Sequence, residues 1–159
     1  GEWHINVIDE VIHEKNIKTD ELINIIKSKR YGVRQYYGDP AGMQAQGQSG
    51  LGDIEIFKRN GIYVQSVRDK TSRNIASGIS HVRGFIENAN DNRYLHLDRK
   101  CVGLAEDLEN YRYPEAVENK HLKPEPLKDG RHDHGCDMLR YFFINQFPIK
   151  RNKLIMRNR

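Results

Sequence analysis

Near the end of the chain, a cluster of acids and histidines leads into apolar residues at helical spacing: Gly130-Arg131-His132-Asp133-His134-Gly135-Cys136-Asp137-Met138-Leu139-Arg140-Tyr141-Phe142-Phe143. From Leu139 onward the apolar side chains fall at positions 139, 142 and 143, which is typical of a helix with one buried face. In such a helix Asp133, His134 and Asp137 occupy positions i, i+1 and i+4. The segment therefore predicts a helix face that carries two carboxylates and an imidazole.

Spacing alone allows two interpretations of this face. Like charges at i and i+4 weaken a helix by about 0.2–0.5 kcal/mol, and a divalent metal ion between Asp133 and Asp137 would relieve that repulsion. Alternatively, Asp133 caps the helix start, where the helix dipole favours an acid, and Asp137 pairs with Arg140.

Length and composition favour one globular domain. The chain has 159 residues, of which 37% are hydrophobic and 30% charged. No apolar run approaches the roughly 18 residues of a membrane span, so a soluble, intracellular protein is expected. The net charge of +4 favours an anionic partner. Cys101 and Cys136 both fall in predicted helices, which argues against a disulfide framework.

Apolar periodicity predicts short strands alternating with amphipathic helices, and hence an α/β fold. The predicted strands lie at 3–7, 33–38, 62–67 and 94–97. The first predicted helix begins at the cap Thr19 and has an apolar stripe at Leu22, Ile25 and Ile26, and the second begins at the cap Ser49 with a stripe at Leu51, Ile54 and Phe57. Two further helices are predicted from stripes at Ile75, Ile79, Val82 and Ile86 and at Cys101, Val102, Ala105 and Leu108. Because a helix joins strands 33–38 and 62–67, these strands should be adjacent and parallel.

Two polar segments follow these strands. Asp39 ends the strand at 33–38, where ligands gather in open α/β sheets, although a plain turn before Pro40 would also place an aspartate there. After the strand at 62–67, cations and hydroxyls precede a helix and suit a phosphate, and a solvated loop would explain the same residues. These residues are Arg68, Lys70, Thr71, Ser72 and Arg73.

Two of these segments resemble motifs of one family. Residues 133–141 are similar to the Asp-His-Ala-Met-Asp-Ala-Leu-Arg-Tyr signature that closes the nuclease domain of tailed-bacteriophage terminase large subunits, with Gly135-Cys136 in place of Ala-Met. Tyr36-Tyr37-Gly38-Asp39-Pro40-Ala41-Gly42 resembles the second acidic motif of that family. The order of the intervening elements also agrees, so the resemblance covers nearly the whole chain.

The resemblance implies a ribonuclease H-like mixed sheet flanked by helices over residues 1–148, followed by a basic tail over 149–159. The strand at residues 3–9 looks like the third strand of that sheet, so its first two strands and first acidic motif are missing. We do not expect Asp9 or Glu10 to substitute, because the antiparallel direction implied for their strand would place them away from Asp39. No Gly-x-x-x-x-Gly-Lys-Ser/Thr phosphate loop occurs, so the terminase motor is not part of this chain.

The chemistry implied by the resemblance is phosphodiester hydrolysis by two Mg²⁺ or Mn²⁺ ions. Asp39 and Asp137 would bind the metals, Asp133 would assist, and His134 would orient water or bind Mn²⁺. The basic residues Arg68, Lys70, Ser72 and Arg73 would face the DNA.

The partners implied are double-stranded DNA, the terminase motor domain, the small subunit and the portal of the procapsid, in the cytoplasm of a bacterial host rather than a membrane or the exterior. Three alternatives stay open. The first is a non-catalytic DNA-binding or assembly module, and the second is another ribonuclease H-like nuclease such as a junction resolvase. The third is a zinc site formed by His132, His134 and Cys136. The zinc site ranks last, because a second Cys/His pair at finger spacing is lacking.

Overall fold

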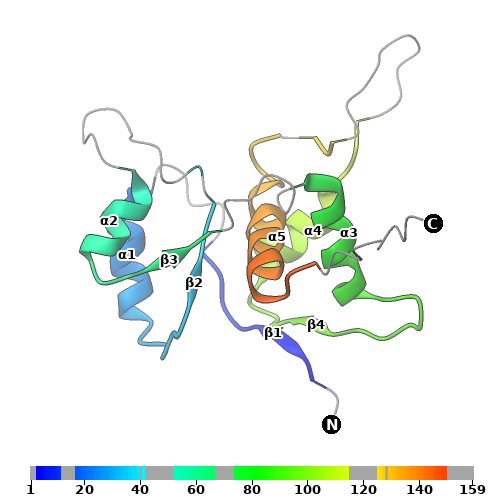
Figure 1. Cartoon of the computed structure of the whole chain (residues 1–159), viewed down its shortest axis with the longest axis horizontal. Helices are drawn as coiled ribbons and strands as arrows, with labels where there is room; N and C mark the ends of the chain where they lie inside the picture. The colour runs from blue at the N-terminus through cyan, green and yellow to red at the C-terminus, as the bar shows by residue number, and fades with distance from the viewer. Residues whose placement is uncertain are drawn as a thin grey trace, which may run out of the picture.

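The structure is a computed structural model that describes residues 3–11, 17–39, 41, 52–66, 74–114, 125–127 and 129–149. Within these ranges the chain is an α/β protein with five helices and four short strands (Figure 1). In order they are β1 (Ile5–Val7), α1 (Thr19–Ser28), β2 (Tyr36–Tyr37), α2 (Asp53–Arg59), β3 (Val64–Gln65), α3 (Ile75–Ile86), β4 (Leu95–Leu97), α4 (Val102–Asn110) and α5 (His134–Gln146). None of these described helices is long and apolar enough to cross a membrane.

The described strands form two parallel pairs. β2 pairs with β3 in the register Tyr36 to Val64, which confirms the predicted parallel β-α-β unit. β1 pairs with β4 in the register Ile5 to Leu95. Every pairing among the described residues is parallel and the two pairs are separate, so the predicted single mixed sheet is not seen in these ranges and stays a prediction. β1 and β2 line a common cleft of about 630 Å³ and are not hydrogen-bonded to each other.

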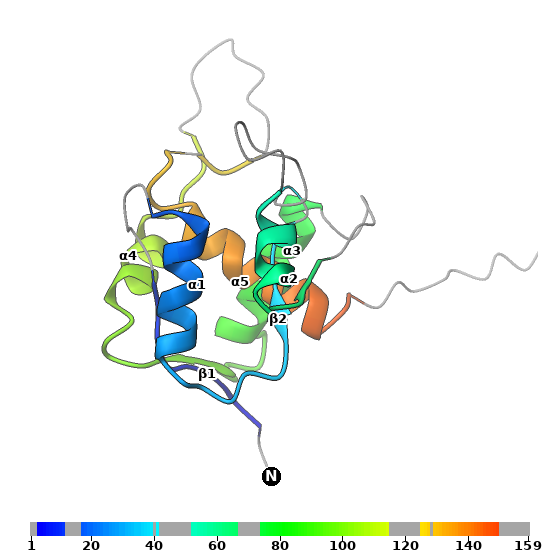
Figure 2. The same cartoon turned by 90° about the vertical axis from the view of Figure 1, so that its left-hand side faces the viewer.

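The pairs belong to two halves of the molecule. The β2–β3 half contains α1, β2, α2 and β3, and the β1–β4 half contains β1, β4, α3, α4 and α5 (Figure 1). Viewed from the side of the β2–β3 half, α1 and α2 stand in front of α5 (Figure 2). Tyr37 of β2 reaches α5: its ring packs edge-on against Phe142 at 5.9 Å, and its hydroxyl lies 2.5 Å from Gln146 Oε1.

The core of the β1–β4 half lies between its helices and the inner face of its sheet. Four side chains are buried there: Val82, Leu104, Leu139 and Phe143. Phe143 is fully buried, and replacing such a side chain with alanine typically costs about 3–5 kcal/mol. Trp3 extends this core by stacking on Tyr94 at 5.1 Å and on Phe147 at 5.6 Å. The start of β1 and the end of α5 are thereby joined.

Helix starts and stripes differ in detail from the predictions. The N-cap of α1 is Lys18 rather than Thr19, and α2 begins after Gly52, beyond the predicted cap Ser49, which lies outside the described residues. In α1 the most buried residue is Ile23, which was not in the predicted stripe. In α4 Val102 is 65% exposed, because the buried face runs through Leu104 and Asp107 instead.

Candidate functional site

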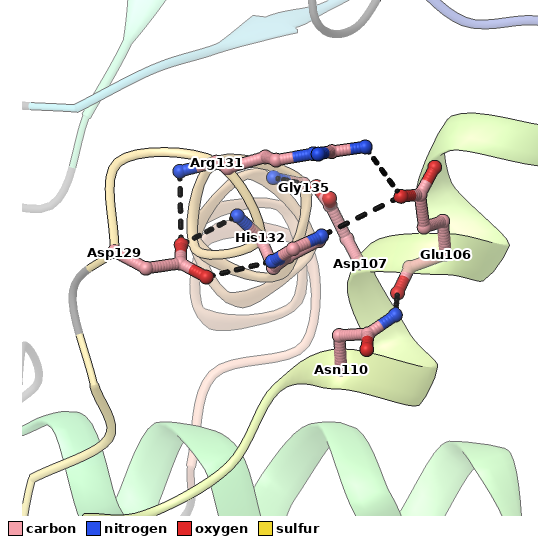
Figure 3. A network of polar contacts seen from close by, with 7 residues as sticks. All are labelled: Glu106, Asp107, Asn110, Asp129, Arg131, His132 and Gly135. Carbon is pink, nitrogen blue, oxygen red and sulfur yellow. Dashed lines mark hydrogen bonds and ion pairs between the residues drawn. The ribbon is translucent and has the colours of Figure 1, made fainter.

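The acidic segment enters α5 through a turn built by Asp129. Its Oδ1 accepts hydrogen bonds from the backbone N–H of Arg131 at 2.9 Å and of His132 at 2.7 Å. Gly130, which lies between Asp129 and Arg131, adopts a φ of +70°, and glycine tolerates this without a steric penalty. His132 Nδ1 lies 2.6 Å from Asp129 Oδ2 (Figure 3). The hydrogen bonds from His132 are the main cause that lowers the pKa of Asp129, and the Asp129 carboxylate raises the pKa of His132.

This turn is fixed to α4 by further polar contacts. Arg131 Nη2 lies 2.8 Å from Glu106 Oε1, and His132 Nε2 lies 3.5 Å from the same oxygen (Figure 3). Deeper in the structure, the N–H of Gly135 donates to Asp107 Oδ2 at 2.8 Å. Asp107 is fully buried, so α4 supplies a buried side-chain acceptor to the first turn of α5, whose backbone donors have no partner within the helix.

Asp133 occupies the N-cap position of α5, as the capping interpretation predicts, but its side chain makes no cap hydrogen bond. It is only 8% exposed, and among the described residues its Oδ1 has no hydrogen-bond partner. A buried carboxylate oxygen without a donor is unfavourable. Asp133, Asp107 and Asp137 also act on Cys136, whose pKa is raised to about 12, mainly by burial and then by these negative charges. Three acidic side chains therefore lie around Cys136 at the start of α5.

Asp137 is paired with a cation on its own helix. Its Oδ1 accepts from Arg140 Nη2 at 2.8 Å and from Arg140 Nε at 3.2 Å, which confirms the predicted pairing. Arg140 is only 4% exposed, and its guanidinium lies 4.5 Å from the ring centroid of Tyr141. The buried guanidinium of Arg140 thus pairs with the Asp137 carboxylate and with the ring of Tyr141.

Asp39 reaches α5 from the end of β2. Its Oδ1 accepts from the N–H of Ala41 at 2.8 Å, as expected of an aspartate in a turn. Asp39 lines one cleft together with Gly135, Met138 and Leu139 of α5. Burial is the largest cause that raises the pKa of Tyr141; Arg140 lowers this pKa, and Asp39 raises it. Asp39 therefore lies beside the helix that carries Asp137.

The described residues do not assemble the predicted metal sites. Among them, no three His, Cys, Asp or Glu side chains lie close enough to hold a metal ion. The zinc alternative also lacks a ligand set here, because His132, His134 and Cys136 do not form such a group of three among the described residues. His134 is exposed at the first position of α5. For Mg²⁺ or Mn²⁺, the oxygen donors suit the ion, but their present arrangement does not form a ligand set.

Asp9 and Glu10 lie closer to the site than expected, because both line the same cleft as Asp39. Asp9 forms an ion pair with Lys29 and accepts from the Tyr31 hydroxyl at 2.8 Å, and these interactions lower its pKa to about 2. Glu10 accepts from the backbone N–H of Gly103 at 2.8 Å and of Leu104 at 2.9 Å, at the start of α4. Both acids thus have structural partners already.

The predicted DNA-binding residues Arg68, Lys70, Ser72 and Arg73 lie outside the described residues, as do positions 150–159 of the basic tail. Sequence reasoning missed Asp107, gave Tyr141 no role beyond its place in the motif, and dismissed Glu10 as a ligand without predicting its contact with α4. For Asp107 a signal existed, because residues 104, 107, 108 and 111 form a helical stripe that includes this single acid. An acid on an apolar stripe indicates a specific buried acceptor.

Comparison of the chain with family models, with curated protein sequences and with solved structures finds no match.

Proposed function

We propose that the chain is the DNA endonuclease module of a phage terminase large subunit, with a ribonuclease H-like fold. The observation that carries this proposal is the meeting of Asp39 with α5. Asp39 ends the segment that resembles one acidic motif of that family, and α5 carries the segment that resembles the other, almost a hundred positions later. Asp39 lines the same cleft as Gly135 and Met138 of α5, and Tyr37, two positions before it, packs on Phe142 of that helix.

The chemistry of the region also supports the proposal. When bound, Mg²⁺ or Mn²⁺ ions would supply an activated water and stabilise the leaving oxygen of a phosphodiester. Asp39 and Asp137 offer carboxylate oxygens for such ions, and the buried Asp133 oxygen without a partner among the described residues is a further donor. His134 is exposed at the same helix start and can hold or orient a water molecule.

The resemblance implies a further carboxylate, which would complete the ligand set that the described acids do not form. Among the described strands, β1 pairs only with β4 and β2 only with β3, so each has one open edge. Both strands line the cleft of about 630 Å³, and so do apolar side chains of α1, α2 and α5 such as Ile26, Phe57 and Phe142. The two strands implied by the resemblance would pair along these edges, and one of them would bring the first acid of the site.

A second candidate function is a non-catalytic DNA-binding or assembly module. It is favoured by the Arg140–Asp137 ion pair, which already neutralises one predicted ligand. A metal ion would have to compete with a buried guanidinium for that carboxylate.

A plasmid assay separates the two functions. Cleavage of supercoiled DNA is measured with Mn²⁺ and Mg²⁺, for residues 1–159 and for the chain extended by the upstream coding sequence. We expect weak cleavage by residues 1–159, greater with Mn²⁺ than with Mg²⁺, and strong cleavage by the extended chain. Asp39→Asn and Asp137→Asn should each abolish cleavage. Asp91→Asn is the matched control, because Asp91 is exposed and its φ of +58° suits asparagine equally well.

DNA binding is measured in parallel by titration at several salt concentrations. Binding without cleavage in both proteins would favour the non-catalytic module. Cleavage that survives both substitutions would contradict the assignment of Asp39 and Asp137, and the absence of binding and cleavage would contradict both functions.

A further inference from the structure

The outer face of the β1–β4 sheet brings two histidines together. Ile5 and Val7 of β1 pack on the core, and the alternation along the strands leaves His4 and His96 exposed on the other face. Their ring centroids are 4.9 Å apart, and His4 Nδ1 lies 3.0 Å from His96 Nε2. Two ring nitrogens from neighbouring strands therefore converge at a surface that solvent reaches.

We propose that His4 and His96 form a binding site for a divalent transition-metal ion such as Zn²⁺. Two metal–nitrogen bonds of about 2.0–2.1 Å at the tetrahedral angle hold their nitrogens about 3.3–3.4 Å apart. The observed separation of 3.0 Å is shorter by only about 0.3–0.4 Å. A small rotation of the two exposed rings, which turns both nitrogens toward one ion, therefore suffices. Imidazole suits Zn²⁺, Cu²⁺ and Ni²⁺, whereas Mg²⁺ prefers oxygen ligands. Water completes the coordination shell, because both side chains are exposed.

Without metal, one of the two facing nitrogens donates its proton to the other. An ion needs the lone pair of each facing nitrogen, so each ring would then carry its proton on the opposite nitrogen, Nε2 of His4 and Nδ1 of His96.

The site is separate from the acidic start of α5. Leu139 and Phe143 of α5 pack in the same core as Ile5 and Val7, whereas the histidine pair lies on the opposite face of the sheet. The pair binds a nitrogen-seeking ion, and the carboxylates of the proposed nuclease site suit Mg²⁺ or Mn²⁺. The metal site therefore does not depend on the proposed function.

Isothermal titration with Zn²⁺, and with Mg²⁺ as the control ion, tests the proposal. We expect a Zn²⁺ site in the native chain whose affinity is at least about tenfold weaker in His4→Ala and in His96→Ala, and unchanged in Asp91→Asn, the exposed control of the cleavage assay. Zn²⁺ should also raise the Tm of the native protein and not that of His4→Ala, because the ion ties β1 to β4 only in the folded state.

Circular dichroism verifies that each variant is folded, and His96→Gln replaces His96→Ala if the alanine variant is not. Zn²⁺ affinity that is unchanged by both His4→Ala and His96→Ala would overturn the proposal. Affinity that is lost in His134→Ala alone would also overturn it, since the ion would then lie at the start of α5.

Discussion

Gly135→Ala should destabilise the protein, although alanine forms helices better than glycine and occupies this position in the terminase motif. A β-carbon at position 135 would lie 2.4 Å from Asp107 Oδ2 and 3.0 Å from Leu104 Cδ1. The Asp107 carboxylate would have to move by about 1 Å to reach an ordinary contact distance, and it would lose the 2.8 Å hydrogen bond from the Gly135 N–H. Losing a hydrogen bond to a charged acceptor costs about 1.5–3 kcal/mol. Alanine returns at most about 1 kcal/mol, which leaves a net loss of about 0.5–2 kcal/mol.

Gly84→Ala in α3 is the matched control, because nothing lies within 4 Å of a β-carbon built there. It should stabilise the protein by up to about 1 kcal/mol. Urea denaturation of the native chain and both variants measures the free energy of unfolding. Adding Asp107→Ala removes the obstructing oxygen, so the double change should destabilise by less than the sum of the single changes. The close contact between α4 and α5 would be refuted if Gly135→Ala stabilised the protein as much as Gly84→Ala.

Three further predictions concern packing and pH. Gly78→Ala should cost about 1–3 kcal/mol in urea denaturation, because its β-carbon would lie 2.7 Å from two side-chain carbons of Arg140; a neutral result would mean that α3 and α5 separate easily. Asp129 has a lowered pKa, so it stabilises the fold above about pH 4 and loses this stabilising contribution in acid. His132 has a raised pKa, so it stabilises the fold below about pH 6.5 and loses that contribution as the pH rises further. Asp129→Asn should therefore flatten the pH dependence of the unfolding midpoint at both ends, and an unaltered profile would contradict the pairing. Asp9, with a pKa of about 2, stabilises the fold above about pH 4 and loses this contribution between about pH 4 and 2, so Asp9→Asn should remove that part of the acid sensitivity seen by circular dichroism.

Local patterns predicted the elements better than their arrangement. Apolar periodicity located the described helices and strands, and the sequence of strand, helix and strand predicted the parallel pairing of β2 with β3. The pairing of β1 with β4 joins residues about ninety positions apart, and no local pattern specifies it. The start of α2 was misplaced, because Ser49 has the right chemistry for a cap, whereas the backbone turns into the helix only at Gly52.

The candidate site shows the same division. The Arg140–Asp137 pair is a contact between residues three apart on one helix, so spacing predicts it. The acceptors that hold the site come from distant elements: Asp107 binds the N–H of Gly135, and Glu10 binds the start of α4. The apolar stripe of α4 signals that Asp107 is buried, but which N–H it binds depends on how the helices pack.

Trp3 is the single tryptophan of the chain, and it stacks on Tyr94 and Phe147 in the β1–β4 half. Tryptophan fluorescence therefore reports on that half alone, whereas far-ultraviolet circular dichroism also reports on α1 and α2. Gly135, Gly84 and Gly78 all lie in the half that fluorescence observes. Unfolding curves from the two methods coincide only if both halves unfold together. An earlier loss of circular dichroism would mean that the β2–β3 half opens first, along the cleft, while the tryptophan is still stacked.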